Sequence, residues 1–164
     1  MIKKFISYYK PYKKLFILDL IVATIATICS LIYPMMTRVL INETIPNKEI
    51  KVIGIFAIIL MLLYLIKAGC CYFMQYFGHL VGVGMQADMR RDMFNHLEEL
   101  PNSYFDNNRT GDLMSRMIND LMEISELAHH GPEDLFISIV MFLGSFIILS
   151  TINIPLTILV FAFV

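Results

Sequence analysis

Few side chains in this sequence have types and spacing that suit chemistry. Glu126 and His129 form one Glu-x-x-His pair, the unit from which di-iron helical bundles are built. Such a centre needs two copies and further carboxylates that face inward, and the sequence offers one copy. We therefore expect a solvated helix face here and not a metal site. His79 and His96 stand alone in the sequence, so we expect core or surface roles for them and not metal ligation.

Lys67 is the only Lys, Arg, Asp or Glu between residues 52 and 87. A charge inside an apolar helix is costly in a bilayer, so it is a functional candidate by default. It lies about 17 residues after Ile50, roughly 25 Å along a helix, which is too deep for easy snorkelling to the outer surface. Two alternatives stay open: Lys67 faces a substrate cavity and favours anionic or amphipathic cargo, or it packs against or pairs with an acid such as Asp19. Asp19 itself is expected to be a solvated residue near the inner interface.

The cysteines and glycines indicate packing and not catalysis. Cys29, Cys70 and Cys71 lie in apolar runs without the C-x-x-C spacing of zinc or redox sites. A G-x-x-x-x-G-K-[ST] phosphate loop is absent from the sequence, so these residues alone supply no ATP-hydrolysing site, and we assign no catalytic, cofactor-binding or metal-ligating residue. The glycines at 78, 82 and 84 occur in a helical context, where small residues allow helices to approach closely.

The composition is that of a membrane protein. Of the 164 residues, 57% are hydrophobic and 16% are charged, against about 25% charged in ordinary soluble domains. The first fourteen residues carry five lysines and no acid, which predicts a cytoplasmic N-terminus in the cell membrane. Residues 86–134 carry eleven acids against four arginines. A basic nucleic-acid-binding footprint is therefore not indicated.

The apolar runs predict an all-α protein with several membrane spans. Residues 1–14 are expected to form an interfacial segment, broken at Pro11, and residues 15–40 a first span followed by a polar turn. The second span, residues 51–87, continues as an amphipathic helix to residue 100, where Pro101 should end it. Residues 52–100 as one helix would be about 73 Å long, whereas a bilayer core needs only about 30 Å. A helix that reaches so far into water is expected to contact something there.

The second half of the chain returns to the membrane. Residues 102–110 are rich in turn formers, and Gly111 and Asp112 suit a helix start. The helix that follows should kink at the Gly131-Pro132 pair and continue as a third span over residues 135–151. Asn153 and Pro155 mark a turn before residues 156–164, which cover only about 14 Å and so represent the start of a fourth span in a longer protein. The stripe expected to be buried on the helix after the turn consists of Met114, Met117, Ile118, Leu121, Ile124 and Ala128.

A longer pattern in the charged segment resembles a known family. Residues 100–106 read L-P-N-S-Y-F-D, residues 110–116 read T-G-D-L-M-S-R, and Asn119-Asp120 follow. This order and spacing is similar to the first intracellular loop of ABC exporters, whose type-1 transmembrane domain has a pattern like L-P-x-x-F-F-D-x-x-x-T-G-D-L-x-S-R-x-x-N-D. Tyr104 stands where that family commonly has Phe. The residues that precede the motif, which include Arg90 and Arg91, also resemble this family. So do residues 34–46, which follow the first span. The resemblance therefore covers nearly the whole chain.

The resemblance implies the N-terminal portion of a six-helix ABC exporter transmembrane domain, here residues 15–164. It implies an intracellular loop with a coupling helix at about residues 102–116, whose tip at residues 107–116 seats on a nucleotide-binding domain. By this resemblance, ATP and Mg²⁺ belong to that domain, which lies downstream or on a separate chain. It also implies a second transporter half, identical or homologous, and a small-molecule, lipid or peptide cargo. The residues carried over as contact candidates are Arg109, Thr110, Gly111, Asp112, Ser115 and Arg116.

One other class of protein shares long helices that cross a membrane. A membrane-anchored signalling receptor could use a helical cytoplasmic stalk to relay motion to an output domain. Such a receptor would not need the chain to re-enter the membrane after its charged segment, whereas residues 135–164 carry no charge and are expected to do so. The sequence therefore favours the exporter interpretation.

Overall fold

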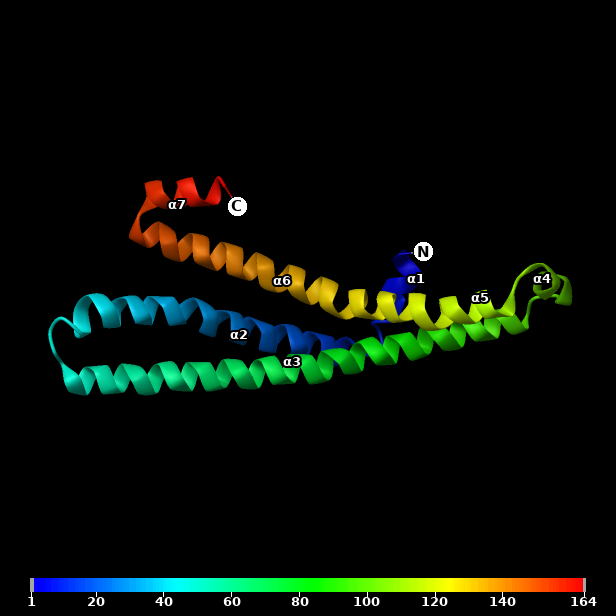
Figure 1. Ribbon diagram of the computed structural model, residues 1–164, viewed down its shortest axis with the longest axis horizontal. Helices are drawn as coiled ribbons and strands as arrows, with labels where there is room; N and C mark the ends of the chain where they lie inside the picture. Colours follow the sequence, from blue (N-terminus) through cyan, green and yellow to red (C-terminus); the bar gives the residue numbers. More distant parts are fainter. Residues whose placement is uncertain (1, 164) are drawn as a thin grey trace. The chain divides into compact units, whose positions relative to one another are not determined.

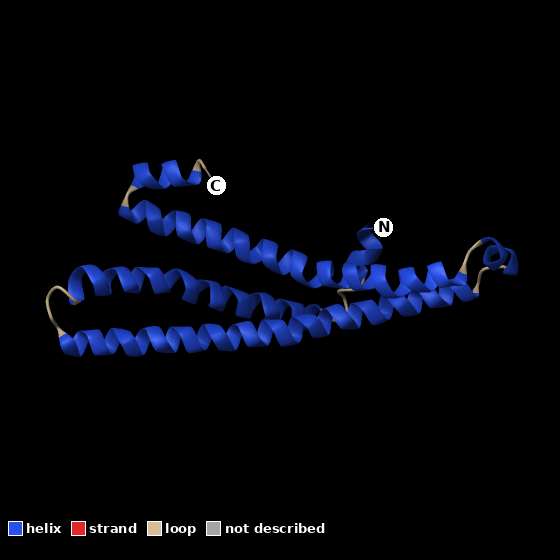
Figure 2. Cartoon of the chain, viewed as in Figure 1, coloured by secondary structure: helices blue, strands red, loops and turns tan. Residues whose placement is uncertain are grey.

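The computed structural model describes residues 2–163, and this part of the chain is all-α, without strands (Figures 1 and 2). Among these residues, three helical stretches are long and apolar enough to cross a membrane: Lys13–Thr44, Ile50–Glu98 and Thr110–Ile152. The predicted all-α fold with long apolar helices is therefore confirmed. The elements in order are α1 (Ile2–Ser7), α2 (Lys13–Val39), a π-helical turn (Leu40–Thr44), α3 (Ile50–Glu98), α4 (Asn102–Asn107), α5 (Thr110–Ser115), a second π-helical turn (Arg116–Asp120), α6 (Leu121–Ile152) and α7 (Ile154–Phe161).

The long helix has the length that the sequence predicts. Helix α3 runs unbroken for 49 residues, two positions nearer the N-terminus than expected. Pro11 lies in the turn between α1 and α2, as expected of a residue that lacks a backbone donor.

The structure differs from the local predictions at two turns. Residues 42–44 are helical where a polar turn was expected. Residues 102–107 form α4, where the turn formers predicted a loop and the resemblance implied part of a coupling helix. Helix α6 continues through Gly131 and Pro132, and the kink expected there stays a prediction. A proline removes only its own backbone donor, and the remaining hydrogen bonds of this 32-residue helix hold it on both sides.

The chain divides into two compact units, which are described separately. The first unit contains the residues up to Asp19 together with Met74–Glu133. The second unit contains Leu20–Phe73 and the residues from Asp134 onward. Helices α2, α3 and α6 each contribute to both units.

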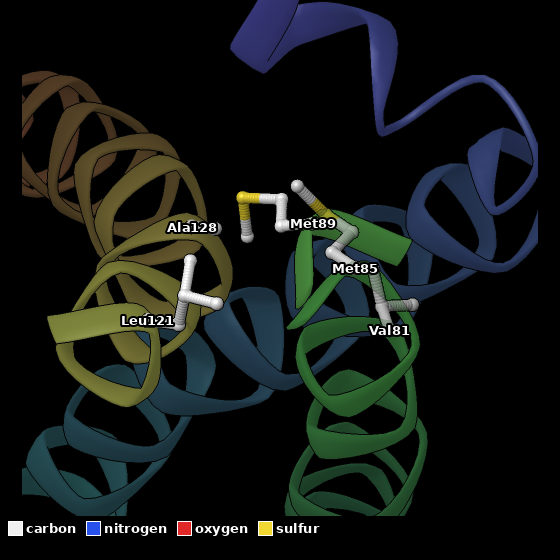
Figure 3. Packing of buried hydrophobic residues seen from close by; sticks show 5 residues of the cluster. All are labelled: Val81, Met85, Met89, Leu121 and Ala128. Atoms are coloured by element: carbon white, nitrogen blue, oxygen red, sulfur yellow. The ribbon is translucent and has the colours of Figure 1, made fainter. Parts of the chain in front are cut away.

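The core of the first unit lies between α3 and α6 and has sulfur-rich side chains at its centre (Figure 3). Val81, Met85 and Met89 from α3 meet Leu121 and Ala128 from α6. Met85 is fully buried. Flexible thioethers fill irregular gaps between helices well.

Glycines allow the elements of the first unit to approach closely, as the sequence predicted. A β-carbon on Gly78 would overlap the imidazole of His129 on α6. A β-carbon on Gly84 would lie 2.5 Å from the ring of Tyr12, which is also closer than real contacts. The absence of a side chain at each position is therefore a packing requirement.

Three tyrosines tie the N-terminal segment to α3 and α6. The Tyr8 hydroxyl donates to Oδ2 of Asp92 at 2.7 Å, and the Tyr9 hydroxyl donates to the carbonyl of Ala128 at 2.5 Å. Tyr12 donates to Oδ2 of Asp88 at 3.1 Å. Burial, followed by the hydrogen bond to Asp92, raises the pKa of Tyr8 to about 12. This segment was expected at the lipid headgroups, and in the structure its aromatic side chains pack on protein.

The second unit contains the apolar helices and the turn between α6 and α7. A β-carbon on Gly144 of α6 would overlap the end of Leu31 on α2, so these helices also approach closely. Asn153 caps α7, with its side-chain oxygen accepting from the N–H of Leu156 at 3.1 Å. Phe161 packs edge-on against Phe142, with ring centres 4.9 Å apart. The predicted turn at Asn153 is therefore confirmed.

Candidate functional site

The tip of the charged segment is a short helix between two long ones. Helix α3 ends at Glu98, and Pro101, in extended conformation, begins α4. Asn108 and Arg109 are also extended, and α5 starts directly after them. The Asn108 side chain donates to the carbonyl of Tyr104 at 2.8 Å, which closes the turn after α4. Helix α4 thus crosses between the end of α3 and the start of α5 (Figure 1).

All six residues predicted as contact candidates are exposed at this tip. Arg109 precedes α5, and the others lie in its first two turns or just after it. Asp112 was expected to cap this helix; it lies in the first turn, and within the described residues no side chain caps the helix at Arg109. Ser115 accepts a hydrogen bond from the amide of Asn119 at 3.2 Å. The exposed set is Arg109, Thr110, Gly111, Asp112, Ser115 and Arg116.

Apolar side chains beneath the tip anchor it to the two long helices. Phe105 and Leu113 are half-buried, and Met117 is buried. Together with neighbours on α3 they line a hollow of about 240 Å³. The tip is thus seated on an apolar base, and its polar groups face outward.

The turn formers did not predict helix α4, although the resemblance implied a coupling helix over residues 102–116, which include it. Its exposed side chains Asn102, Ser103 and Asp106 extend the polar outer surface beyond the residues chosen from the sequence. A signal was present: a proline immediately before a segment favours a helix start, and Tyr104 and Phe105 supply an apolar face one turn later.

The apolar stripe predicted after the tip is only partly buried. Met117, Leu121 and Ala128 are buried against α3, as expected. Met114 and Ile118 are 51% and 54% exposed, which contradicts the prediction that they share the buried face. Ile124 is exposed as well, at 38%, so the helix has a second apolar face that the described residues leave open.

Lys67 lies beside a cavity in the second unit. This cavity of about 290 Å³ lies between α2 and α3, and its lining includes Cys29, Tyr33, Tyr64 and Lys67. Lys67 is itself exposed. A role for Lys67 in a substrate cavity stays a prediction.

Two polar residues expected in solvent are buried. Asp19 is only 1% exposed, and its carboxylate oxygens have no hydrogen-bond partner within residues 2–163. His129 is 3% exposed, because it fills the space that Gly78 leaves open on α3. His79 does not stand alone either: its ring centre lies 5.5 Å from that of His129 and 5.6 Å from that of His130. These contacts join residues about 50 positions apart, so sequence spacing could not show them.

The tip presents charges, hydroxyls and backbone groups on a rigid support. Such an arrangement suits recognition of another folded surface, since polar groups held by an apolar base lose little freedom on binding.

Comparison with known proteins identifies the class of these helices. The family described as ABC transporter transmembrane region matches residues 16–164. The chain is 41% identical over 161 residues to an uncharacterized ABC transporter ATP-binding protein, YwjA, of Bacillus subtilis. It is 23% identical over 165 residues to a putative multidrug export ATP-binding/permease protein, YgaD, of the same species. It is 24% identical over 124 residues to an ATP-dependent lipid A-core flippase of Idiomarina loihiensis.

These relatives are much longer than the chain. The match covers 98% of this chain but 28% of YwjA, 97% of this chain but 28% of YgaD, and 76% of this chain but 21% of the flippase. The chain therefore spans less than a third of the length of the curated relatives that it matches.

Proposed function

Because the chain belongs to the ABC transporter transmembrane family, we propose that its tip couples an ATP-driven domain to the movement of its membrane helices. The chain is the membrane part of a transporter, and the family match leaves the signalling-receptor alternative without support. In this proposal the tip, residues 102–116, seats on a nucleotide-binding domain. ATP and Mg²⁺ bind in that domain, which is downstream or on a separate chain.

The observation that carries this proposal is the unbroken length of α3. Its 49 residues correspond to about 73 Å of helix, more than twice the thickness of a bilayer core. A continuous helix transmits displacement along its axis, because its hydrogen bonds resist bending. Helix α3 and the returning helix α6 can therefore act as a stiff pair that connects the tip with the membrane.

Transport requires the site for the cargo to face each side of the membrane in turn. We propose that two transporter halves, identical or homologous, rock against each other, and that closure of the nucleotide-binding domains drives the rocking through the tip. In this scheme the lysine-rich N-terminus and the tip both lie on the cytoplasmic side of the cell membrane.

The cargo proposed here is an anionic or amphipathic molecule. The named relatives include a putative multidrug exporter and a lipid A-core flippase. Lys67 lines the cavity between α2 and α3, where a cation is costly unless an anionic group or water meets it. Export of a small molecule or a lipid with a negative group fits both observations.

The coupling role is tested by two substitutions at the tip of the whole transporter. Asp112→Ala with Arg116→Ala removes opposite charges from the exposed surface without touching the apolar base. We expect transport per ATP hydrolysed to fall severalfold, with ATP binding retained. The matched control is Lys10→Ala with Glu123→Ala, which removes another exposed pair of opposite charges away from the tip. Unchanged coupled transport in the tip variant would refute the assignment.

A further inference from the structure

Five ionisable side chains gather where α3 and α6 meet in the first unit. His79 comes from α3, and Glu126, His129, His130 and Glu133 come from α6. Nδ1 of His79 lies 3.9 Å from Oε1 of Glu126, and Nε2 of His130 lies 3.5 Å from Oε2 of the same carboxylate. Nε2 of His129 lies 3.4 Å from Oε2 of Glu133. The function proposed above does not account for this cluster.

The cluster exists because of local packing on both helices. Gly78 leaves room for the ring of His129, which is buried directly beside His79. Glu126 and His130 are four residues apart, so they lie on one face of α6, one turn from each other. The ring of His130 packs on that of His129 with centres 4.5 Å apart, which restricts its orientation.

We propose that His79, Glu126 and His130 form a binding site for one divalent transition-metal ion of the zinc type. One ligand atom from each of these residues lies within 4.8 Å of the others. Two imidazoles and a carboxylate match the donor set of zinc sites that keep a fourth position for water. Neutral imidazole also favours this class of ion over Mg²⁺ and Ca²⁺, which prefer oxygen ligands.

The distances fit coordination better than direct hydrogen bonding. With metal–ligand bonds of about 2.0–2.1 Å, the ligand atoms of a tetrahedral site lie about 3.4 Å from each other. Nε2 of His130 lies 3.5 Å from Oε2 of Glu126, close to this value, and Nδ1 of His79 lies 3.9 Å from the other carboxylate oxygen, Oε1. A charge-assisted N–H···O hydrogen bond would be about 2.7–2.9 Å long. The carboxylate and the two rings are thus spaced to surround an ion.

A second set of ligands overlaps the first and is less suitable. His129, His130 and Glu133 also lie within reach of one ion, but all three belong to α6. His129 and Glu133 are buried, with side chains 3% and 7% exposed. A hydrated ion reaches partly exposed ligands more readily, and the side chains of His79, Glu126 and His130 are 48%, 52% and 38% exposed. The proposed site is therefore the set that comes from both helices, His79, Glu126 and His130.

An ion at this position would join α3 to α6. His79 lies nine residues before Asp88, where the charges of α3 begin, and Glu126 and His130 precede the span expected at residues 135–151. The site therefore lies toward the charged end of α3, where ions in water can reach it. An ion that binds the folded protein and not the unfolded chain would stabilise the contact between the two helices.

The test uses the whole transporter in lipid nanodiscs, purified without a polyhistidine tag and freed of metal. Co²⁺ is the probe, because a tetrahedral site gives it visible absorption, and Zn²⁺ should displace it. We expect one tightly bound Co²⁺ per chain, and at least tenfold weaker binding in each of the variants His79→Ala, His130→Ala and Glu126→Gln. The matched control is His96→Ala. It removes an exposed histidine of α3 that lies outside the cluster, beside the carboxylate of Glu99.

A second measurement separates loss of a ligand from loss of the fold. Co²⁺ should raise the midpoint of thermal unfolding of the unmodified protein and of His96→Ala, and should leave that of His79→Ala unchanged. If His79→Ala lowers the midpoint without metal, His79→Gln is measured in its place, with the same expectation. The absence of saturable Co²⁺ absorption would overturn the proposal. Binding that survives His79→Ala but is lost in His129→Ala would place the ion within α6 and would also overturn it.

Discussion

Gly78 and Gly82 lie on the same face of α3, one turn apart, yet alanine at these positions should have different effects. A β-carbon on Gly82 would lie 3.4 Å from the carbonyl oxygen of Ser125, which is ordinary contact. A β-carbon on Gly78 would lie 2.7 Å from Nδ1 of His129 and nearer still to two other ring atoms. The imidazole would have to retreat by more than 0.7 Å to restore ordinary contact. Since His129 is 3% exposed, the ring cannot simply swing into solvent.

The magnitude follows from two terms. Alanine is favoured over glycine inside a helix by about 0.8–1.0 kcal/mol, and both variants gain this equally. Overpacking a well-filled site lowers the free energy of unfolding by about 1–3 kcal/mol, and this loss applies only to Gly78→Ala. The free energy of unfolding of Gly78→Ala should therefore be about 1–3 kcal/mol lower than that of Gly82→Ala.

The measurement is the midpoint of unfolding, followed by circular dichroism, for the unmodified protein and both variants in identical nanodiscs. The midpoint of unfolding of Gly82→Ala should equal or exceed that of the unmodified protein, and Gly78→Ala should have the lowest midpoint of the three. The double variant Gly78→Ala with His129→Ala provides a control, because removing the ring should make the alanine tolerable. A Gly78→Ala variant as stable as Gly82→Ala, or one that His129→Ala does not rescue, would refute the close contact of α3 and α6 described here.

Three further outcomes follow from contacts in the first unit. The pKa of Tyr8 is about 12 in the folded protein, whereas the ordinary value is 10.0. The contribution of Tyr8 to stability is therefore complete below pH 10 and is lost as the pH rises toward 12. The difference in tyrosinate absorbance between the unmodified protein and Tyr8→Phe should have its midpoint near pH 12. Met85→Ala should lower the free energy of unfolding by about 2–5 kcal/mol, since Met85 is fully buried. Met122→Ala, at a side chain that is 58% exposed, should change it by less than about 0.5 kcal/mol when measured in the same denaturation series.

The long elements were predictable because their signals are repeated many times. Helix α3 lacks proline over its whole length, and its apolar residues continue at helical spacing after the charges begin, so its type and extent followed from pattern alone. The turn at Asn153 was predictable for a different reason: an Asn cap followed by Pro is a strong local signal.

The errors concern properties that depend on neighbours distant in sequence. Nothing near Asp19 in the sequence shows that it is buried, and nothing near His79 shows that His129 and His130 lie beside it. Met114 and Ile118 have helical spacing suited to a buried face, but they are 51% and 54% exposed, and which face of a helix is buried depends on its packing partner and not on spacing alone. Residue pattern alone did not show helix α4, because a six-residue helix carries too few residues for periodicity to appear; only the resemblance implied a helix there.

The contacts of the N-terminal tyrosines have a consequence for the order in which the protein is made. Tyr9 donates to the carbonyl of Ala128, 119 residues later in the chain. At synthesis rates of about 5–20 residues per second, the partner of Tyr9 emerges roughly 6–24 s after it. During this interval the aromatic and lysine side chains of α1 suit the lipid headgroups, the place that the sequence alone suggested for them. We therefore expect the N-terminal segment to lie at the lipid headgroups first and to pack on α3 and α6 once Ala128 has been made.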